Sequence, residues 1–266
     1  MNTKQQLILF RKKFLIAIAN LSMLQLASCS LAFYSPARLG SDMTYQPKPM
    51  ISDSLKVNTY LSAVYHARGA DNVDDQKFYA ELNVNRAHAF NNWNLSYGAN
   101  SYVGNYTNGL LTPNDTYYFE QKSLWGYGFR SALNYVMSTG RTDFRFPGFE
   151  FSYSKELGAY ADFRQVLTQQ SEFFYAEPKS DLCTLGGSVE LIWHQKKYTY
   201  NRFSFRLFLG RTLGKITYRN QFEYYADNNQ ENVYNWSFMF QHKQLSFLFE
   251  SSRMLKIGLI YGINKY

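Results

Sequence analysis

The stretch that decides the fold is WGYGFRSALNYVM, residues 125–137. Its odd-numbered positions are mostly large and apolar, and small or polar residues stand between them, namely Gly126, Gly128, Arg130, Ala132 and Asn134. A period of two predicts a β-strand whose two faces meet different surroundings. At thirteen residues the stretch is longer than an ordinary strand and suits one that crosses a bilayer at a tilt.

The same alternation recurs from residue 55 to the C-terminus. Apolar and aromatic residues take alternate positions in 57–65, 78–84, 93–99, 189–193, 203–209, 234–240, 245–249 and 255–263. The opposite face of each stretch is rich in Gly, Ser and Asn, with isolated Arg and Glu. Such a face suits the inside of a narrow barrel, where buried charges can pair.

The composition excludes several classes of protein. Aromatic residues make up 18% of the chain and charged residues also 18%, below the usual quarter. With 45% apolar residues, the chain is not disordered, collagen-like or a coiled coil. Two cysteines exclude a disulfide-dense scaffold and a four-cysteine zinc site, and four histidines leave little for a metal centre. We therefore expect no cofactor.

The links between the predicted strands alternate in length. Short links near 91–92, 138–141, 197–201 and 242–244 alternate with long ones near 67–76, 106–117, 155–182 and 214–232. This favours an all-β, antiparallel up-and-down transmembrane barrel over residues 55–266. We predict about ten strands, with eight and twelve left open, and a soluble β-sandwich is the alternative fold. Parity places the start of the first strand, and with it the N-terminus, in the periplasm.

One long link contains a helical pattern. Its apolar and basic residues recur at helical spacing at Leu157, Tyr160, Ala161, Arg164 and Leu167. The pattern predicts a short helix inside a loop, with an additional strand pair as the alternative.

The N-terminus predicts export. Residues 1–28 contain no acidic residue and four basic ones, Lys4, Arg11, Lys12 and Lys13. The mostly apolar run 14–27 is too short to span a bilayer, which needs about 20 residues, so we predict a signal peptide over 1–28. Its end, Leu26-Ala27-Ser28-Cys29, resembles the lipobox of bacterial lipoproteins. The resemblance implies cleavage before Cys29 and its acylation by lipid, palmitate included. An unlipidated export signal with a chance cysteine is the alternative.

Residues 29–54 are predicted to form a lipidated tether. They hold three of the six prolines and show no clear period. No acidic residue follows Cys29 before Asp42. The surface-export signal of some Bacteroidota lipoproteins carries acidic residues directly after the cysteine. Its absence here favours an anchor in the periplasmic leaflet.

Cleavage changes the charge and the thiol content. Removing residues 1–28 leaves 24 basic and 20 acidic residues, a net charge of +4. Together with export, this weak charge argues against a nucleic-acid partner. Acylation of Cys29 would leave Cys183 without a partner in the chain, so we predict that Cys183 is a buried, unreactive thiol.

The C-terminus supplies a second resemblance. Residues 256–263, KIGLIYGI, are similar to the signal that the barrel-assembly machinery reads in the last strand of outer-membrane barrels. The positions that carry the pattern are Lys256, Gly258, Tyr261 and Ile263. The chain departs from it by the three-residue tail Asn264-Lys265-Tyr266. The resemblance implies that this machinery is a partner during biogenesis.

The histidines, which could take part in catalysis or metal binding, are dispersed along the sequence. The four histidines are His66, His88, His194 and His242, without the spacing of outer-membrane proteases or phospholipases. Two of them, His66 and His88, could face each other across the first hairpin as an acid–base or metal pair, although two rim histidines are the plainer interpretation. A loop cluster, Asp71, Asp74 and Asp75, could hold a cation or be merely solvated. We find no phosphate loop, nucleophile elbow or zinc motif and expect no catalytic, cofactor-binding or metal residue.

These patterns point to a lipid-anchored outer-membrane β-barrel with a structural or accessory role in a complex of the cell envelope, and not to an enzyme. Its partners would be outer-membrane lipids and a protein of that complex. A ten-strand barrel with charged residues inside is too narrow for an open pore. Two alternatives remain: a barrel enzyme that acts on lipid or peptide at the rim, and a lipid-anchored soluble β-sandwich that serves as a binding module.

Overall fold

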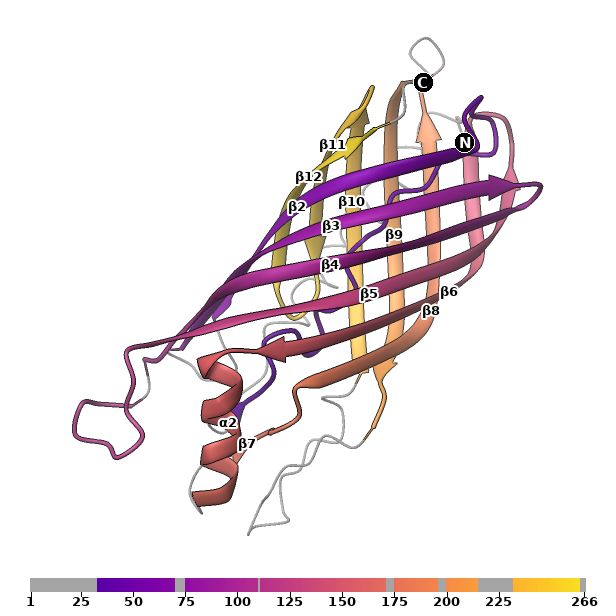
Figure 1. The fold of residues 1–266 in the computed structure, drawn as a ribbon. Coiled ribbons are helices and arrows are strands. Elements are labelled where there is room, and N and C mark those ends of the chain that lie inside the picture. The colour runs from indigo at the N-terminus through magenta and orange to yellow at the C-terminus, as the bar shows by residue number, and fades with distance from the viewer. Residues whose placement is uncertain are drawn as a thin grey trace, which may run out of the picture. The chain divides into compact units, whose positions relative to one another are not determined.

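The structure, a computed structural model, describes residues 33–69, 75–109, 111–170, 175–195, 200–214 and 232–263. In chain order its elements are β1 (Phe33–Tyr34), β2 (Val57–Gly69), β3 (Gln76–Phe90), β4 (Trp93–Thr107), β5 (Gln121–Ser138), β6 (Thr142–Leu157), α2 (Ala159–Gln170), β7 (Tyr175–Ala176), β8 (Asp181–His194), β9 (Asn201–Thr212), β10 (Asn232–His242), β11 (Leu245–Ser251) and β12 (Leu255–Gly262). Ten strands, β2 to β6 and β8 to β12, close an antiparallel barrel, in which β12 pairs with β2 (Figure 1). The predicted ten-strand barrel is confirmed, and an open sandwich is excluded.

The links divide the barrel into two unlike ends. Short links at 91–92, 139–141, 195–200 and 243–244 define what we call the turn end. Longer links at 70–75, 108–120, 158–180 and 213–231 define the loop end, which also carries the short link 252–254. Two of the turns contain a residue with positive φ, Asn91 at 49° and Lys243 at 54°. Such residues suit the tight hairpin turns whose twist matches that of the strands.

Burial alternates along every strand as the sequence predicts. In β3 the even-numbered positions from Gln76 to Phe90 face outward and the odd-numbered ones face the lumen. The outward residues include apolar side chains that stay well exposed, such as Leu82, Val103, Phe149 and Leu209, each 60–64% exposed. Many of the inward residues are polar or charged yet buried. This barrel is therefore apolar outside and polar inside, the reverse of a soluble protein.

The helix predicted in the long link is present as α2. It follows Gly158, whose φ of +100° is one that other residues rarely adopt and whose carbonyl accepts the amide hydrogens of Ala161 and Asp162. The competing strand pair is therefore wrong. No helix in the described part of the chain is long and apolar enough to cross a membrane.

The lumen is filled by the chain itself. Residues 35–53, which we call the plug, run through the barrel between β1 and the start of β2 (Figure 1). All residues from Tyr34 to Met50 are buried. The plug bonds to successive positions of β6, pairing residues 37 with 156, 42 with 152, 49 with 145 and 51 with 143. It therefore runs antiparallel to β6, from the loop end to the turn end.

Two expectations about the N-terminal segment need correction. The described part of the predicted tether is a buried plug, because backbone groups of the plug and the side chains of Arg38, Lys48 and Asp53 find partners inside the barrel. Parity correctly places the start of β2 at the turn end. The parity argument does not hold for the residues before β2, because this segment crosses the lumen and Phe33 pairs with Tyr175 at the loop end.

Candidate functional site

The lumen holds most of the charged side chains that the strands bury. Inward positions of β3 and β5 supply Glu81 and Arg130, and the plug supplies Arg38 between them. Glu81 accepts hydrogen bonds from Arg38 Nη2 at 2.6 Å and from Arg130 Nη2 at 2.8 Å. Asn100 and Asn83 accept further bonds from the two guanidinium groups. One buried carboxylate thus joins the plug to two strands of the wall.

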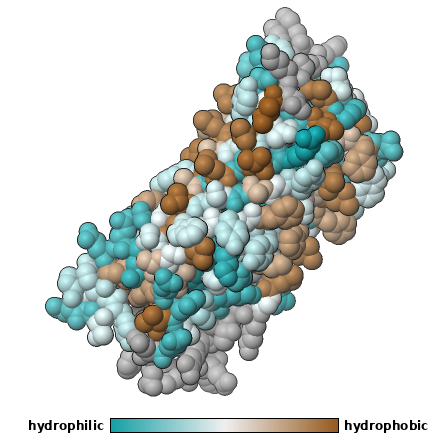
Figure 2. Space-filling model, viewed as in Figure 1, coloured by the Kyte–Doolittle hydropathy of each residue, from teal (hydrophilic) through white to brown (hydrophobic). Residues whose placement is uncertain are grey.

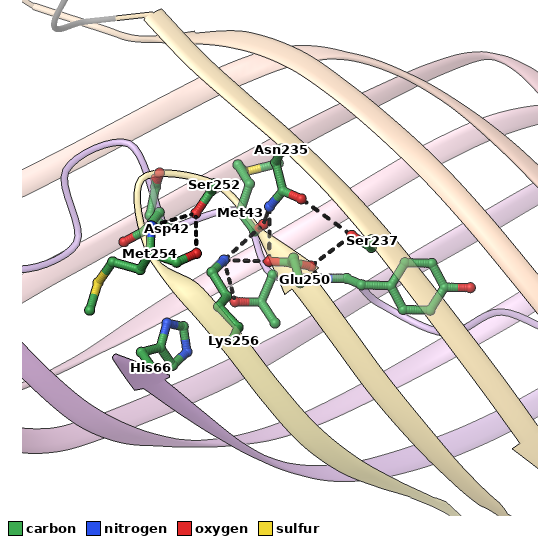
Figure 3. Close-up of polar contacts among 12 residues, drawn as sticks. Asp42, Met43, His66, Asn235, Ser237, Glu250, Ser252, Met254 and Lys256 are labelled. Atoms are coloured by element: carbon green, nitrogen blue, oxygen red, sulfur yellow. Dashed lines mark hydrogen bonds and ion pairs between the residues drawn. The ribbon is translucent and has the colours of Figure 1, made fainter. Parts of the chain in front are cut away.

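A second cluster lies where β10, β11 and β12 face the plug (Figure 3). Glu250 forms an ion pair with Lys256 and accepts hydrogen bonds from Ser237 at 2.8 Å and Asn235 at 2.9 Å. Asn235 and Lys256 also donate to the carbonyl oxygen of Met43 in the plug. The amide of Tyr45 donates to Glu250 at 2.9 Å. Backbone groups of the plug that would otherwise be buried without partners are thereby satisfied.

A third cluster lies nearer the turn end. Arg145 of β6 donates to Glu190 of β8 at 2.9 Å and to the carbonyl of Pro49 at 2.8 Å. The hydroxyl of Tyr45 donates to Glu190 at 2.5 Å, and Lys48 lies 3.4 Å from the same carboxylate. Ion pairs also join Asp53 to Arg202 at 2.5 Å and Glu150 to Arg206 at 2.5 Å.

These pairings decide what the lumen can do. The carboxylates of Glu81, Glu190 and Glu250 are each held by cationic partners, so none is placed as a free base or nucleophile. Paired charges in a buried interior fix one arrangement, because a displaced partner would leave an uncompensated charge behind. The arrangement holds the plug in one position.

Aromatic side chains close the loop end over the plug. Tyr34 packs edge-on against Phe163 of α2, with ring centroids 5.3 Å apart. Tyr106 of β4 stacks on Tyr160 at 4.2 Å, and the Tyr160 hydroxyl donates to the carbonyl of Ser35 at 2.9 Å. Arg164 of α2 forms an ion pair with Glu156 at 2.6 Å. Burial, with the Asp75 and Asp115 carboxylates adding to it, raises the pKa of the Tyr34 phenol, which stays neutral in this cluster.

His66 and His88, which the sequence allowed to face each other across the first hairpin, do not meet. His88 pairs across the hairpin with Val57 and His66 pairs with Tyr79, so the two lie near opposite ends of β2 and β3. His66 is buried, stacks on Tyr79 and has its Nε2 atom 3.6 Å from Glu81. The rim interpretation is therefore also wrong for His66.

The predicted acidic loop lies mostly outside the described residues, which include only its last member. Asp75 accepts hydrogen bonds from the Tyr106 hydroxyl at 2.5 Å and the Gly109 amide at 2.7 Å. Within the described ranges, no group of three or more His, Cys, Asp or Glu side chains could hold a metal ion.

The C-terminal positions occupy the faces that alternation predicts. Tyr261 is 47% exposed and Ile263 46% exposed on the outer surface, whereas Lys256 and Gly258 face the lumen. A methyl group added at Gly258 would lie 2.9 Å from Val64 Cγ2 and 3.1 Å from the carbonyl oxygen of Ala63, so a larger residue there would force its neighbours to shift. Lys256 likewise has a structural role in the Glu250 ion pair. Recognition of these four residues by an assembly machine stays a prediction.

The structure tests the prediction for only one of the two cysteines. Cys29, the predicted lipidation site, lies outside the described residues. Cys183 forms no disulfide in the described part of the chain and is only partly buried, at an outward-facing position of β8. The expectation of a buried thiol is wrong because position 183 belongs to the outer face.

The outer surface is the second feature with functional meaning. Figure 2 shows hydrophobic side chains spread over the barrel wall, with hydrophilic residues gathered toward the end that carries α2 and the β4–β5 link. Exposed aliphatic and aromatic residues occur on every strand of the barrel. A monomeric soluble protein rarely exposes contiguous apolar patches beyond a few hundred Å², and larger ones mark a membrane or protein interface.

Sequence reasoning missed the plug, although its components were visible. The segment that we interpreted as a tether contains Arg38, Asp42, Lys48 and Asp53. Isolated Arg and Glu residues mark the inward faces of the predicted strands. Charges in a segment with several prolines usually mean solvent exposure, and nothing local says that they match charges in a lumen.

The comparisons with known proteins add no assignment of function. Neither a family model nor a protein of curated function matches the sequence. Among solved structures, the chain resembles the TodX deltaS2S3 mutant monoaromatic hydrocarbon channel, with 9% identity and a TM-score of 0.33. That alignment covers 77% of this chain and 66% of the other, just under two thirds. It also resembles the translocator domain of the autotransporter NalP from Neisseria meningitidis, with 8% identity, a TM-score of 0.39 and coverage of 79% and 88%. Similarity at this level assigns neither a substrate nor a partner.

Proposed function

We propose that this protein is a lipid-anchored outer-membrane β-barrel with a structural or accessory role in a complex of the cell envelope, and that it is neither a pore nor an enzyme. The observation that carries the proposal is the filled lumen. The plug occupies the barrel from the loop end to the turn end, and charged side chains hold it at several levels. We infer from the part of the chain that the structure describes that a barrel blocked in this way conducts neither ions nor solutes.

Insertion in the outer membrane best accounts for the apolar outer surface of the barrel. An all-round apolar exterior needs an apolar solvent, and closed barrels are one of the two structures that can span a bilayer with every backbone group paired. Cys29, at the end of the predicted signal peptide, would add the lipid anchor. An anchor is redundant for mere attachment of a barrel, so we infer that it serves positioning within an assembly.

Conductance and assembly size test the proposal on the wild-type protein. In planar bilayers the purified protein should give no stable conductance steps. A variant lacking residues 34–50, checked for folding by heat-dependent gel mobility, should conduct because its polar lumen is open. In a mild-detergent extract the wild-type protein should migrate on native gels well above the position of a single mature chain with its detergent. Stable steps from the wild type, or migration only as a single chain, would refute the proposal.

The lipid anchor is tested separately. Replacing Cys29 with alanine should abolish incorporation of a clickable fatty acid, since acylation needs the thiol. The matched control is Cys183→Ala, which should label as strongly as the wild type. Equal labelling of the Cys29→Ala protein would remove the anchor from the proposal.

A further inference from the structure

The direction of the plug determines the end of the barrel at which the N-terminal segment emerges. At the turn end, Asp53 pairs with Arg202, the second residue of β9, a few residues before β2 begins. At the loop end, β1 pairs in parallel with β7, and Ser35 accepts the hydrogen bond from Tyr160 of α2. The chain that precedes Phe33 therefore starts from the loop end.

Chain length keeps Cys29 at that end. Four residues separate the Cα atoms of Cys29 and Phe33, and a fully extended chain of that length reaches about 14 Å. The plug contacts β6 from residue 143 to residue 156. At the rise of a β-strand those residues extend about 43 Å, and a tilt of roughly 40° still leaves about 33 Å along the barrel axis. Cys29 cannot reach the turn end, even fully extended.

The plug is also held too firmly to slide toward the turn end. Its partners lie at different depths: Glu81 holds Arg38, Glu250 holds the amide of Tyr45, and Arg202 holds Asp53. A shift of the plug by even one residue would separate all three contacts and leave charges buried without partners.

We propose that the acylated Cys29 lies at the loop end, so that its fatty acyl chains insert into the outer leaflet and the anchor is on the cell surface. The inference rests on the proposed function, because it requires that Cys29 is acylated and that the barrel spans the outer membrane. In such barrels the short turns face the periplasm and the longer loops face outward. The geometry thus opposes the periplasmic leaflet, which the lack of acidic residues after Cys29 favours.

Single-cysteine labelling tests the side directly. In a Cys183→Ala background the acylated Cys29 thiol is blocked, and the reporter variants are Leu31→Cys beside the anchor, Asn114→Cys at the loop end and Thr139→Cys at the turn end. Asn114 and Thr139 are both exposed. Intact and permeabilised cells are treated with a membrane-impermeant maleimide. Leu31→Cys and Asn114→Cys should label equally in both, whereas Thr139→Cys should label only after permeabilisation.

Each contrary outcome has its own meaning. Labelling of Leu31→Cys only after permeabilisation, with Asn114→Cys accessible in intact cells, would overturn the inference. Labelling of Thr139→Cys alone in intact cells would mean that the barrel is inserted in the reverse orientation, and it would also overturn the surface anchor. Failure of the proposed function is detected elsewhere, by loss of the Cys29-dependent fatty-acid signal. The background Cys183→Ala protein supplies the blank, and heat-dependent gel mobility confirms that each variant folds.

Discussion

Replacing Glu81 with alanine is expected to lower the free energy of unfolding by about 3–5 kcal/mol, the largest effect of any single change considered. Its carboxylate is fully buried and is shared by Arg38 of the plug and Arg130 of β5. Alanine would remove the carboxylate that both guanidinium groups contact. Their desolvation is then uncompensated, which is why removing one member of a buried ion pair costs far more than an exposed pair contributes.

The measurement is the urea concentration or temperature at which the barrel loses its compact gel mobility. Glu120→Ala is the matched control, because Glu120 is exposed in the β4–β5 link and should change the stability by less than about 0.5 kcal/mol. Glu81→Gln keeps the shape and should fall between the two. Equal stability of the Glu81→Ala and Glu120→Ala proteins would show that the plug is not held by this carboxylate.

Arginine in place of Leu207 should destabilise the inserted barrel by about 2–4 kcal/mol. Leu207 lies at the middle of β9 on the outward face, where its neighbours across the sheet are Trp236 and Val189. A guanidinium group there would have to enter the hydrocarbon core of the bilayer. Near the membrane interface the same change costs about 0–1 kcal/mol, so Leu213→Arg, just beyond the loop end of β9, is the control.

Both leucine variants are folded into lipid vesicles and unfolded in urea, and the difference between their free energies of unfolding is compared. A large gap between them supports a bilayer around the middle of the wall. Should both variants lose the same amount, depth would not matter, and the apolar wall would be better explained as a protein interface. Ser204 is unsuitable as an inward control, because its hydroxyl lies 3.0 Å from both Tyr45 and Glu190 and leaves no room for arginine.

The outward and inward faces of the strands were determined by the sequence alone. Side chains alternate across a strand with a period of two, so the composition of each face follows from the position number. This local rule correctly assigned Leu207 and Tyr261 to the outer wall and Glu81 to the lumen. The alternating stretches correctly predicted about ten strands, and helical spacing predicted α2, because strands and helices are likewise recorded over short stretches.

Only the tertiary structure decided what fills the lumen. The plug has no period because it is a single irregular pass whose partners come from every side, with Tyr45 145 residues away from Glu190 and Arg38 43 residues from Glu81. Its charges resembled those of a solvated tether. For the two histidines, only the strand register shows that His66 and His88 lie near opposite ends of the hairpin. Closure of the barrel brings Arg38, Tyr45 and Asp53 next to their partners, and the course of the plug leads the preceding chain to the loop end. Such long-range pairing depends on the whole sheet, so no single stretch of the sequence reveals it.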